Sequence, residues 1–351
     1  MLFLRVMLRA NLIGLLPSEL EDLAVALGAS RYRGRQLATW IYRKGVVDLA
    51  AMTDLPRDFK ERLSQEHEIT LPVLERQTPS QDGSRKLVFR LNDDRRVSAV
   101  LMPDDGRITL CLSTQVGCGF GCAFCLTGTM GLDRNLTAAE ILGQLLVAGT
   151  LLEGAERVTH VVFMGMGEPL ANLANLAPAL RIMIDPRLGL GYSPRRLTVS
   201  TVGLVSGIER LAREDLKVNL AISLHGATDE VRGRLMPVNR SWNVEALMAA
   251  VRRYPLAPRQ RVFFEYVMLE DVNDSPEQAR RLAQLLRGVR AKVNLIPFND
   301  WDASGFRRSP LPRILAFQAI LLDAGVTTTV RWSKGEDIGA ACGQLKEPVV
   351  A

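Results

Sequence analysis

The sequence is poor in histidine, cysteine and aromatic residues, and no hydrophobic run is long enough to cross a membrane. Only three of its 351 residues are histidine, so a zinc site built from cysteine and histidine has few candidate ligands. The best apolar stretch, residues 141–152, falls short of the roughly 20 residues that a membrane-spanning helix needs, which predicts a buried helix instead. The N-terminus is apolar, but Arg5 and Arg9 interrupt it where a secretory signal needs an unbroken apolar segment. We therefore expect a cytoplasmic protein with no membrane partner.

What the chain does contain is an ordinary globular mixture with a modest positive charge. Hydrophobic residues make up 47% and charged residues 23%, which excludes collagen, a coiled-coil rod and a mostly disordered chain. The length is sufficient for one large domain or two smaller ones with a substantial core. Lysine and arginine number 44 against 38 acidic residues, a formal net charge of +6. That excess is compatible with a nucleic-acid partner but does not require one.

Residues 1–75 are predicted to form a small helical accessory domain. Its first helix opens at Pro17, with Ser18 as the N-cap and Glu21 three residues further on. Two more helices are expected over 33–44 and 56–66. Residues 76–107 are predicted to be a short β extension, because two alternating runs flank an Asn-Asp-Asp turn and so predict a hairpin.

Residues 108–330 show a different pattern, in which seven β-rich runs alternate with helical stretches. The runs are ITLCLST, THVVFMG, RRLTVST, VNLAISL, RVFFEYVML, KVNLIPF and TTTVRWS. Helices are expected over 136–155, 275–286 and 311–324, the first opened by Thr137 and Glu140 as a capping box. This alternation predicts an α/β fold with a full or partial TIM-like barrel, whose chemistry collects at the C-terminal strand ends. Residues 331–351 remain as a C-terminal tail.

Three of the five cysteines form a loop with the spacing C-x3-C-x2-C: Cys118, Cys122 and Cys125. Three thiolates on a short glycine-containing loop can hold one face of a cubane [4Fe-4S] cluster and leave its fourth iron open to a substrate. A zinc site of three cysteines and one histidine is an alternative, although structural zinc usually shows paired C-x2-C knuckles. Plain buried thiols are the other alternative.

This cysteine loop follows the first strand of an α/β chain, with Phe124 before its last cysteine, and it resembles that of the radical S-adenosylmethionine (SAM) enzymes. In those enzymes the open iron binds SAM, and electron transfer cleaves SAM into methionine and a 5′-deoxyadenosyl radical. Further motifs are similar in order to the RlmN family of the RlmN/Cfr branch. They are YRGRQLATWIYRKG, MTDLP, CLSTQVGCGFGCAFCLTG, VFMGMGEPL, LTVSTVG, ISLHGATDEVRGRLMPVNR, FEYVMLEDVNDS, VNLIPFN and KGEDIGAACGQL. The resemblance covers nearly the whole chain.

Polar residues follow several of the predicted strands, where a barrel gathers its binding groups. Glu168, after a glycine-rich turn, can accept hydrogen bonds from an ammonium group. Ordinary turn polarity and a structural histidine would produce the same pattern at single positions. The resemblance implies that Gly167 and Glu168 bind the amino end of SAM. It places further SAM contacts at Ser200, Ser223, Leu224, His225 and Asn299.

The two remaining cysteines are Cys111 and Cys342. Alternation along ITLCLST places Cys111 on the more polar face of its strand, which in a barrel is the lumen. Cys342 lies among small residues, where a tail loop could enter an active-site mouth. Inert free thiols are the alternative for both. The resemblance implies instead that SAM methylates Cys342, that the 5′-deoxyadenosyl radical takes a hydrogen atom from this methyl group, and that the resulting carbon radical adds to the adenine ring. Cys111 then resolves the covalent linkage by forming a disulfide with Cys342.

One position departs from the family pattern. The family assigns proton removal to a glutamate thirteen residues before the resolving cysteine, and here that position is Ser98. A serine hydroxyl is not a competent base at neutral pH without an activating neighbour. Proton removal would then fall to Cys111 or a bound water, or the reaction would be slow.

The resemblance implies methylation at C2 of adenine, at adenine 2503 in 23S rRNA and at adenine 37 in tRNA, with an electron donor such as flavodoxin. Residues 30–44 hold five basic and no acidic residues, and a helix would place Arg35, Thr39, Tyr42 and Arg43 on one face for RNA phosphates. A merely solvated face is the alternative. The rival functions are the related adenine-C8 rRNA methyltransferase and a non-catalytic iron–sulfur or zinc protein that binds RNA.

Overall fold

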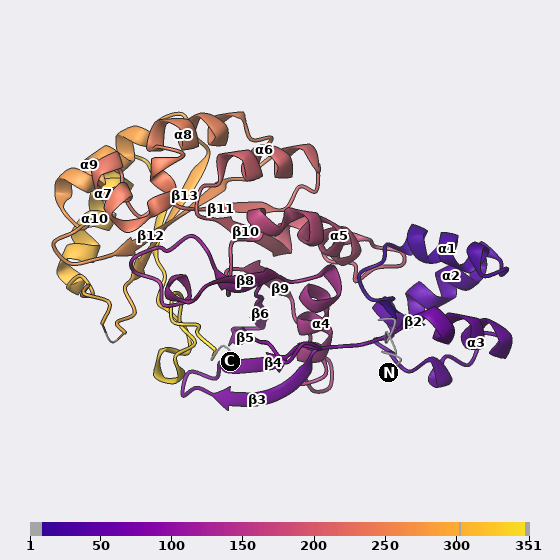
Figure 1. Ribbon diagram of the computed structural model, residues 1–351. Helices are drawn as coiled ribbons and strands as arrows, with labels where there is room; N and C mark the ends of the chain where they lie inside the picture. The colour runs from indigo at the N-terminus through magenta and orange to yellow at the C-terminus, as the bar shows by residue number, and fades with distance from the viewer. Residues whose placement is uncertain (1–8, 302, 348–351) are drawn as a thin grey trace, which may run out of the picture.

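The computed structural model describes residues 9–301 and 303–347 and contains a small helical domain, an accessory antiparallel sheet and a parallel α/β barrel (Figure 1). The helical domain lies at one side of the barrel and the accessory strands lie along its lower edge in this view. Most of the apolar N-terminal start, including Arg5, lies outside the described residues, as does the end of the tail. Among the described residues, no helix is both long and apolar enough to cross a membrane.

The helical domain contains the three predicted helices. Its elements are β1 (Ala10–Asn11), α1 (Pro17–Ala26), α2 (Arg31–Ala38), η1 (Thr39–Arg43), η2 (Leu49–Ala51), α3 (Arg57–Glu66) and β2 (His67–Glu68). The predicted N-cap is wrong by two residues, since α1 is capped at Leu16, whose N–H donates to Glu19 at 2.6 Å. Pro17 occupies the first helical position, where its fixed φ favours helix initiation and its missing N–H costs nothing.

Residues 30–44 do not form the continuous α-helix that the sequence predicts. α2 is followed by the π-helical turn η1 (Thr39–Arg43). A π turn contains an extra residue, so it rotates the side chains beyond it to a different face. Tyr42, predicted to share a face with Arg35, is therefore buried, and its hydroxyl donates to the carbonyl of Leu15 at 2.7 Å.

Ten strands form one mixed sheet in the order β14-β13-β12-β11-β10-β9-β6-β5-β4-β3. The antiparallel part is β3 (Val73–Pro79), β4 (Arg85–Arg90), β5 (Arg96–Asp104) and β6 (Arg107–Cys111), which confirms the predicted hairpin. The parallel part continues from β6 through β9 (His160–Phe163), β10 (Leu197–Thr201), β11 (Asn219–Ser223), β12 (Val262–Met268), β13 (Ala291–Pro297) and β14 (Thr328–Val330). All seven predicted barrel strands are confirmed, and they form a partial barrel.

Helices cover the outer face of the parallel strands (Figure 1). They are α4 (Ala138–Gly149), α5 (Leu173–Ile184), α6 (Val205–Arg213), α7 (Asp229–Leu235), α8 (Val244–Arg253), α9 (Pro276–Leu285) and α10 (Leu311–Asp323). Short 3-10 turns are η3 (Thr127–Met130), η4 (Pro169–Asn172), η5 (Pro194–Arg196), η6 (Pro237–Arg240) and η7 (Glu336–Ile338). The predicted capping box of α4 is confirmed, since Thr137 accepts from the Glu140 N–H while Glu140 accepts from the Thr137 N–H.

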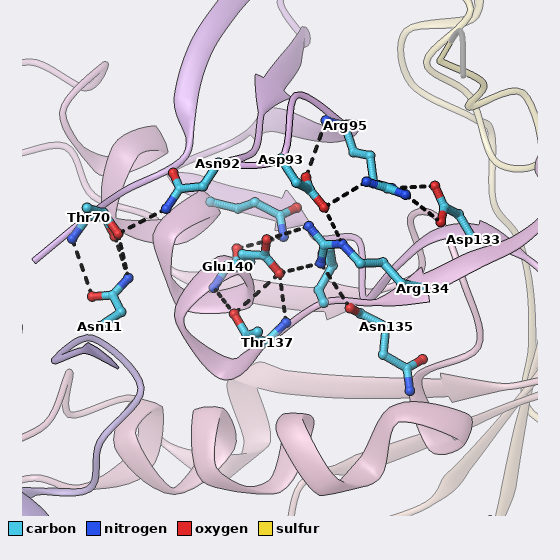
Figure 2. A network of polar contacts seen from close by, with 12 residues as sticks. Asn11, Thr70, Asn92, Asp93, Arg95, Asp133, Arg134, Asn135, Thr137 and Glu140 are labelled. Carbon is cyan, nitrogen blue, oxygen red and sulfur yellow. Dashed lines mark hydrogen bonds and ion pairs between the residues drawn. The ribbon is translucent and has the colours of Figure 1, made fainter. Parts of the chain in front are cut away.

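One small hairpin was not apparent in the sequence. β7 (Gln115–Cys118) and β8 (Gly131–Asn135) pair in antiparallel fashion and enclose the cysteine loop. A polar network connects this hairpin to its surroundings (Figure 2). Arg134 on β8 donates to Asp93 at 2.7 Å and to Glu140 at 2.8 Å, and Asn92 in the β4–β5 turn donates to Thr70 of the helical domain at 3.3 Å. The hairpin, the accessory sheet and the helical domain are thus held together.

Candidate active site

Two cavities adjoin one another, one at the C-terminal ends of the parallel strands and one between β5, β6 and the C-terminal tail. The first, which we call the strand-end cavity, has a volume of about 150 Å³. Its lining includes six residues predicted to contact SAM: Gly167, Glu168, Ser200, Ser223, His225 and Asn299. The second, the thiol cavity, has a volume of about 250 Å³ and is lined by both Cys111 and Cys342. The structure therefore brings these candidate residues from distant parts of the sequence into one region.

Leu224 is placed differently from the other predicted SAM contacts. Its side chain is fully buried in the hydrophobic core, and its backbone N–H donates to the carbonyl of Glu265 at 3.1 Å. The next residue, His225, has a φ of +55°, a left-handed conformation that turns the chain sharply after β11. Ser223 and His225 line the cavity on either side of this inward-pointing leucine.

Glu168 is a buried carboxylate anchored at the turn after β9. Its two oxygens accept from the N–H groups of Val202 at 2.8 Å and Leu170 at 3.1 Å, and its own N–H donates to Gln115 at 2.7 Å. Burial raises its pKa to about 7, although the backbone donors act in the opposite direction. The preceding Gly167 has a φ of +97°, and a Cβ there would lie 2.5 Å from the Gln115 side chain. Only glycine therefore allows this close approach to β7.

His225 is held as a neutral ring. Burial lowers its pKa to about 3, and the charge of Arg232 acts in the same direction. The N–H of Val267 donates to Nδ1 at 3.0 Å, which assigns the ring proton to Nε2. The ring meets Phe124 edge-on, with 4.6 Å between centroids. His225 therefore offers one fixed N–H donor beside the cysteine loop.

The three loop cysteines lie at the end of β7 and in the turn that follows it. Cys122 is buried, while Cys118 and Cys125 are partly exposed, and Cys125 lines both cavities. Gly117, with a φ of +75°, begins the loop, and a Cβ at this position would lie 2.0 Å from the carbonyl oxygen of Gly131. The strand pairing of the hairpin thus depends on a glycine next to the first thiol.

The chemistry of these thiols fits an iron–sulfur cluster. Burial raises the pKa of Cys118 to about 11 and raises the pKa values of Cys122 and Cys125, with neighbouring thiols adding to each shift. Such thiols become thiolates readily only beside a positive metal centre. Within residues 9–301 and 303–347, no three His, Cys, Asp or Glu side chains converge in the way that holds one metal ion. A cubane differs from such a site because its three cysteines bind three different irons.

Cys342 lies where the two cavities meet. The residues that line both cavities are Cys125, Met164, Gly165, Arg331, Cys342 and Gly343. Burial raises the pKa of Cys111 to about 12, with Cys342 adding to the shift and Arg331 opposing it. Cys342 also contributes to the raised pKa of Cys125 and is the main cause of the raised pKa of Arg331. Cys342 lines the strand-end cavity together with Cys125 and the thiol cavity together with Cys111, so it lies near both. No disulfide joins Cys111 to Cys342.

Ser98 lines neither of the two cavities. Its hydroxyl is not isolated, because a carboxylate lies beside it. Its Oγ donates to the Glu347 carboxylate at 2.5 Å, in a fully buried contact. Its carbonyl accepts from the hydroxyl of Ser113 at 2.6 Å. A carboxylate thus lies next to residue 98 although it comes from the C-terminal tail.

Sequence reasoning missed two charged residues that line the strand-end cavity. Arg331, directly after β14, follows the same strand-end pattern as the predicted residues and could have been found by it. Glu265 lies in the apolar strand β12, where a lone charge is itself a signal. Burial raises the pKa of Glu265, whose Oε1 accepts from Asn294 at 2.8 Å while Oε2 lies 3.7 Å from Arg331.

Comparison with known families divides the chain into two matched regions. Residues 10–69 match the ribosomal RNA large subunit methyltransferase N-terminal domain, and residues 112–283 match the radical SAM superfamily. The first region corresponds to the helical domain and the second contains the cysteine loop and most of the parallel strands.

Similar proteins cover nearly the whole chain. A dual-specificity RNA methyltransferase RlmN from Syntrophobacter fumaroxidans is 49% identical over 93% of this chain and 95% of its own length. A probable dual-specificity RNA methyltransferase RlmN from Thermus thermophilus is also 49% identical, over 93% of this chain and 92% of its own. A crystal structure of a radical SAM methyltransferase from Sphaerobacter thermophilus matches with a TM-score of 0.90 and 44% identity, over 95% of this chain and 98% of that one.

Proposed function

The chain belongs to the RlmN family of radical SAM RNA methyltransferases, and we propose that it methylates carbon C2 of adenine in 23S rRNA and in tRNA. The observation that carries this proposal is the position of Cys342 between the strand-end cavity and the thiol cavity. A thiol that receives a methyl group in one site and delivers it in another must face both. C2 of adenine is an electron-poor ring carbon, so it cannot attack the SAM methyl group directly and needs such a carrier.

In this proposal the strand-end cavity binds SAM. Cys118, Cys122 and Cys125 hold a [4Fe-4S] cluster, which when bound supplies the electron that cleaves SAM. Glu168 and Gly167 receive the amino end of SAM. Support comes from the buried Glu168 carboxylate, which two backbone N–H groups hold in a fixed orientation. Ser200, Ser223, His225 and Asn299 contact the rest of the molecule from neighbouring strand ends.

Cys342 accepts a methyl group from one SAM and presents it to the adenine in the thiol cavity. A 5′-deoxyadenosyl radical from a second SAM takes a hydrogen atom from this methyl group, and the resulting carbon radical adds to C2 of adenine. The adduct loses one electron, which the cluster can take back, and the C2 proton, which leaves the base joined to Cys342 through the methylene carbon. Cys111 then attacks the sulfur of Cys342, which forms a disulfide and breaks the carbon–sulfur bond, and the released carbon takes up a proton to become the methyl group of the product. Support comes from the thiol cavity, whose lining includes both Cys111 and Cys342. A reductant must then restore both thiols. Separately, an electron donor such as flavodoxin, in the cytoplasm, would supply the electron for SAM cleavage.

We propose that the four regions predicted from the sequence have separate roles. Residues 1–75 act as an accessory domain for rRNA and tRNA, 76–107 as a β extension, 108–330 as the radical SAM core, and 331–351 as the tail with the methyl carrier. Support for an RNA role comes from the match of residues 10–69 to an rRNA methyltransferase domain. The exposed Tyr32 ring, with Arg33 and Arg35 within 6.0 Å of its centroid, adds a surface on which a base can stack.

The test is an anaerobic assay of the reconstituted protein with a 23S rRNA fragment, SAM and reductant. We expect 2-methyladenine in the digested RNA and none with Cys342→Ala. Cys111→Ala should form the covalent link between RNA and Cys342 without resolving it, so cross-linked RNA should accumulate. A product methylated at C8, or full activity of Cys342→Ala, would overturn the proposal.

A further inference from the structure

The C-terminal tail that carries Cys342 crosses the accessory strands and is fastened near its start. The N–H of Gly335 donates to Asp82 in the β3–β4 turn at 2.8 Å. Asp337 accepts from the hydroxyl of Ser80 at 2.5 Å and from the N–H of Gln81 at 3.0 Å in the same turn. One end of the tail is therefore fixed to the outer hairpin of the sheet.

The other end of the described tail is fastened by a buried carboxylate. Glu347 is 2% exposed, and its Oε1 accepts from Ser98 at 2.5 Å and lies 2.9 Å from Lys86 Nζ. Its Oε2 lies 3.3 Å from Arg76. These partners come from β3, β4 and β5, so one side chain connects the tail to all three accessory strands. Lys86 is only 9% exposed, so each charge depends on the other for compensation.

Cys342 lies between these two fastenings and is held mainly through backbone groups. Its carbonyl accepts from Asn299 at 3.1 Å, and the carbonyl of Gly343 accepts from the N–H of Leu126 at 2.7 Å. The carbonyl of Leu345 accepts from the hydroxyl of Thr127. Leu126 and Thr127 follow the cysteine loop directly. These contacts hold the backbone of the tail, so they position Cys342 between the cysteine loop and Cys111 without involving its sulfur atom.

We infer that Glu347 is a positioning residue that fastens the tail to the accessory strands and thereby holds Cys342 where the two cavities meet. This inference rests on the proposed role of Cys342 as methyl carrier. It also assigns a role to Ser98. A hydroxyl there donates to the carboxylate and leaves room for it, whereas an acidic side chain at residue 98 would occupy the same space and repel Glu347. Ser98 accordingly binds the tail through Glu347 and does not act as a weak substitute for the family's catalytic glutamate.

The first test measures hydrogen–deuterium exchange of the C-terminal peptide in the reconstituted, full-length protein. Glu347→Gln removes the charge but keeps the size of the side chain, and Ser98→Glu introduces repulsion. Both variants should speed exchange of the tail by at least about tenfold. In Glu347→Gln the buried Lys86 loses its charged partner, and in Ser98→Glu the new carboxylate repels that of Glu347. The exposed neighbour Lys346 supplies the matched control, since Lys346→Gln should exchange as the wild type does.

The second test follows methylation of Cys342 by SAM in the absence of RNA, read by mass spectrometry of the intact protein. Glu347→Gln should slow this transfer at least about tenfold while the Kd for SAM stays unchanged, which a general loss of folding would not produce. Lys86→Met should slow the transfer to a similar extent. The double variant should be no slower than either single variant, because each single change already removes the ion pair between Lys86 and Glu347.

The outcomes separate the inference from the proposed function. Tail exchange in Glu347→Gln that equals that of Lys346→Gln overturns the inference, even if the wild type methylates RNA. Methylation of Cys342 at the wild-type rate in Glu347→Gln overturns it as well. Faster tail exchange in Glu347→Gln, in a protein whose wild type never methylates Cys342, supports the fastening and rejects the proposed function.

Discussion

Glu168 and His225 show how burial sets the charge of single groups in the strand-end cavity. The pKa of Glu168 rises to about 7 and that of His225 falls to about 3, because burial opposes the charged form of each. His225 therefore stays neutral across the physiological range. Glu168 lies at the balance point, so a cationic ligand can shift it fully to the carboxylate.

The shift at Glu168 predicts a pH dependence of stability. The folded state holds a proton on Glu168 up to about pH 7, whereas the unfolded chain releases it near the ordinary value of 4.5. The unfolded state thus binds fewer protons between these values, and the free energy of unfolding falls as pH rises through that window. Relative to Glu168→Gln, which cannot titrate, the wild type should lose about 3 kcal/mol between pH 4.5 and 7 and nothing more above it.

Urea denaturation of both proteins, without cluster or SAM, from pH 4.5 to 8 measures this difference. The absolute stability of Glu168→Gln will also change, because its amide cannot accept from both backbone donors. The comparison therefore uses only the slope with pH. Parallel curves for the two proteins would show that Glu168 has an ordinary pKa.

Among the elements, the β7–β8 hairpin holds the two ends of the cysteine loop together. A Cβ on Gly117 would lie 2.0 Å from the Gly131 carbonyl oxygen, and the φ of +75° disfavours any other residue. Gly117→Ala should therefore open the hairpin and reduce the iron bound per chain by roughly half or more. Gly119→Ala is the matched control, because its Cβ would lie 3.3 Å from the Cβ of the exposed Leu132, a contact that a shift of a few tenths of an ångström relieves.

Iron analysis after anaerobic reconstitution provides the measurement. Gly119→Ala should bind as much iron as the wild type. Equal loss in both variants would mean that the loop tolerates no change at all and that the strand pairing at Gly117 has no special role.

The strands could be predicted from the sequence because each combines β-branched residues with a clear alternation or a short apolar run. The cysteine hairpin could not, since glycine and polar residues hide strands that are held by tertiary contacts such as Gln115 with Asn135. The π turn at Thr39–Arg43 left no pattern in the sequence either. At the site, the strand-end pattern predicted residues that line the strand-end cavity, among them Ser200, Ser223 and Asn299. The contact between Ser98 and Glu347 spans 249 positions, and no local pattern connects them.

At the scale of the whole molecule, the proposed function requires that RNA reach the thiol cavity from outside. Trp332 lines that cavity and is 55% exposed, and Arg107 and Lys334 lie on the same lining. A large exposed ring that shares a cavity lining with two cations is suited to stack on a base beside the target nucleotide. The candidate site thus has an exposed aromatic ring on the lining of the cavity that holds Cys111 and Cys342.

Trp332→Ala should weaken RNA binding roughly 5- to 150-fold, the range that one lost base stack produces. Trp332→Phe should retain most of the affinity, since it keeps an aromatic face. Methylation of Cys342 in the absence of RNA should be unchanged in both variants. Filter binding at fixed salt gives the affinities, and an alanine variant that binds as the wild type does would place the RNA elsewhere.

The most direct measurement asks whether the methyl group passes through Cys342. The protein is first loaded with a ¹³C-methyl group from labelled SAM, freed of excess SAM, and then given RNA, reductant and unlabelled SAM for a single turnover. If Cys342 carries the methyl group between the two cavities, the first 2-methyladenine contains the ¹³C label. If the first product is unlabelled while the label stays on the protein, the methyl group comes directly from SAM and the account of Cys342 is wrong.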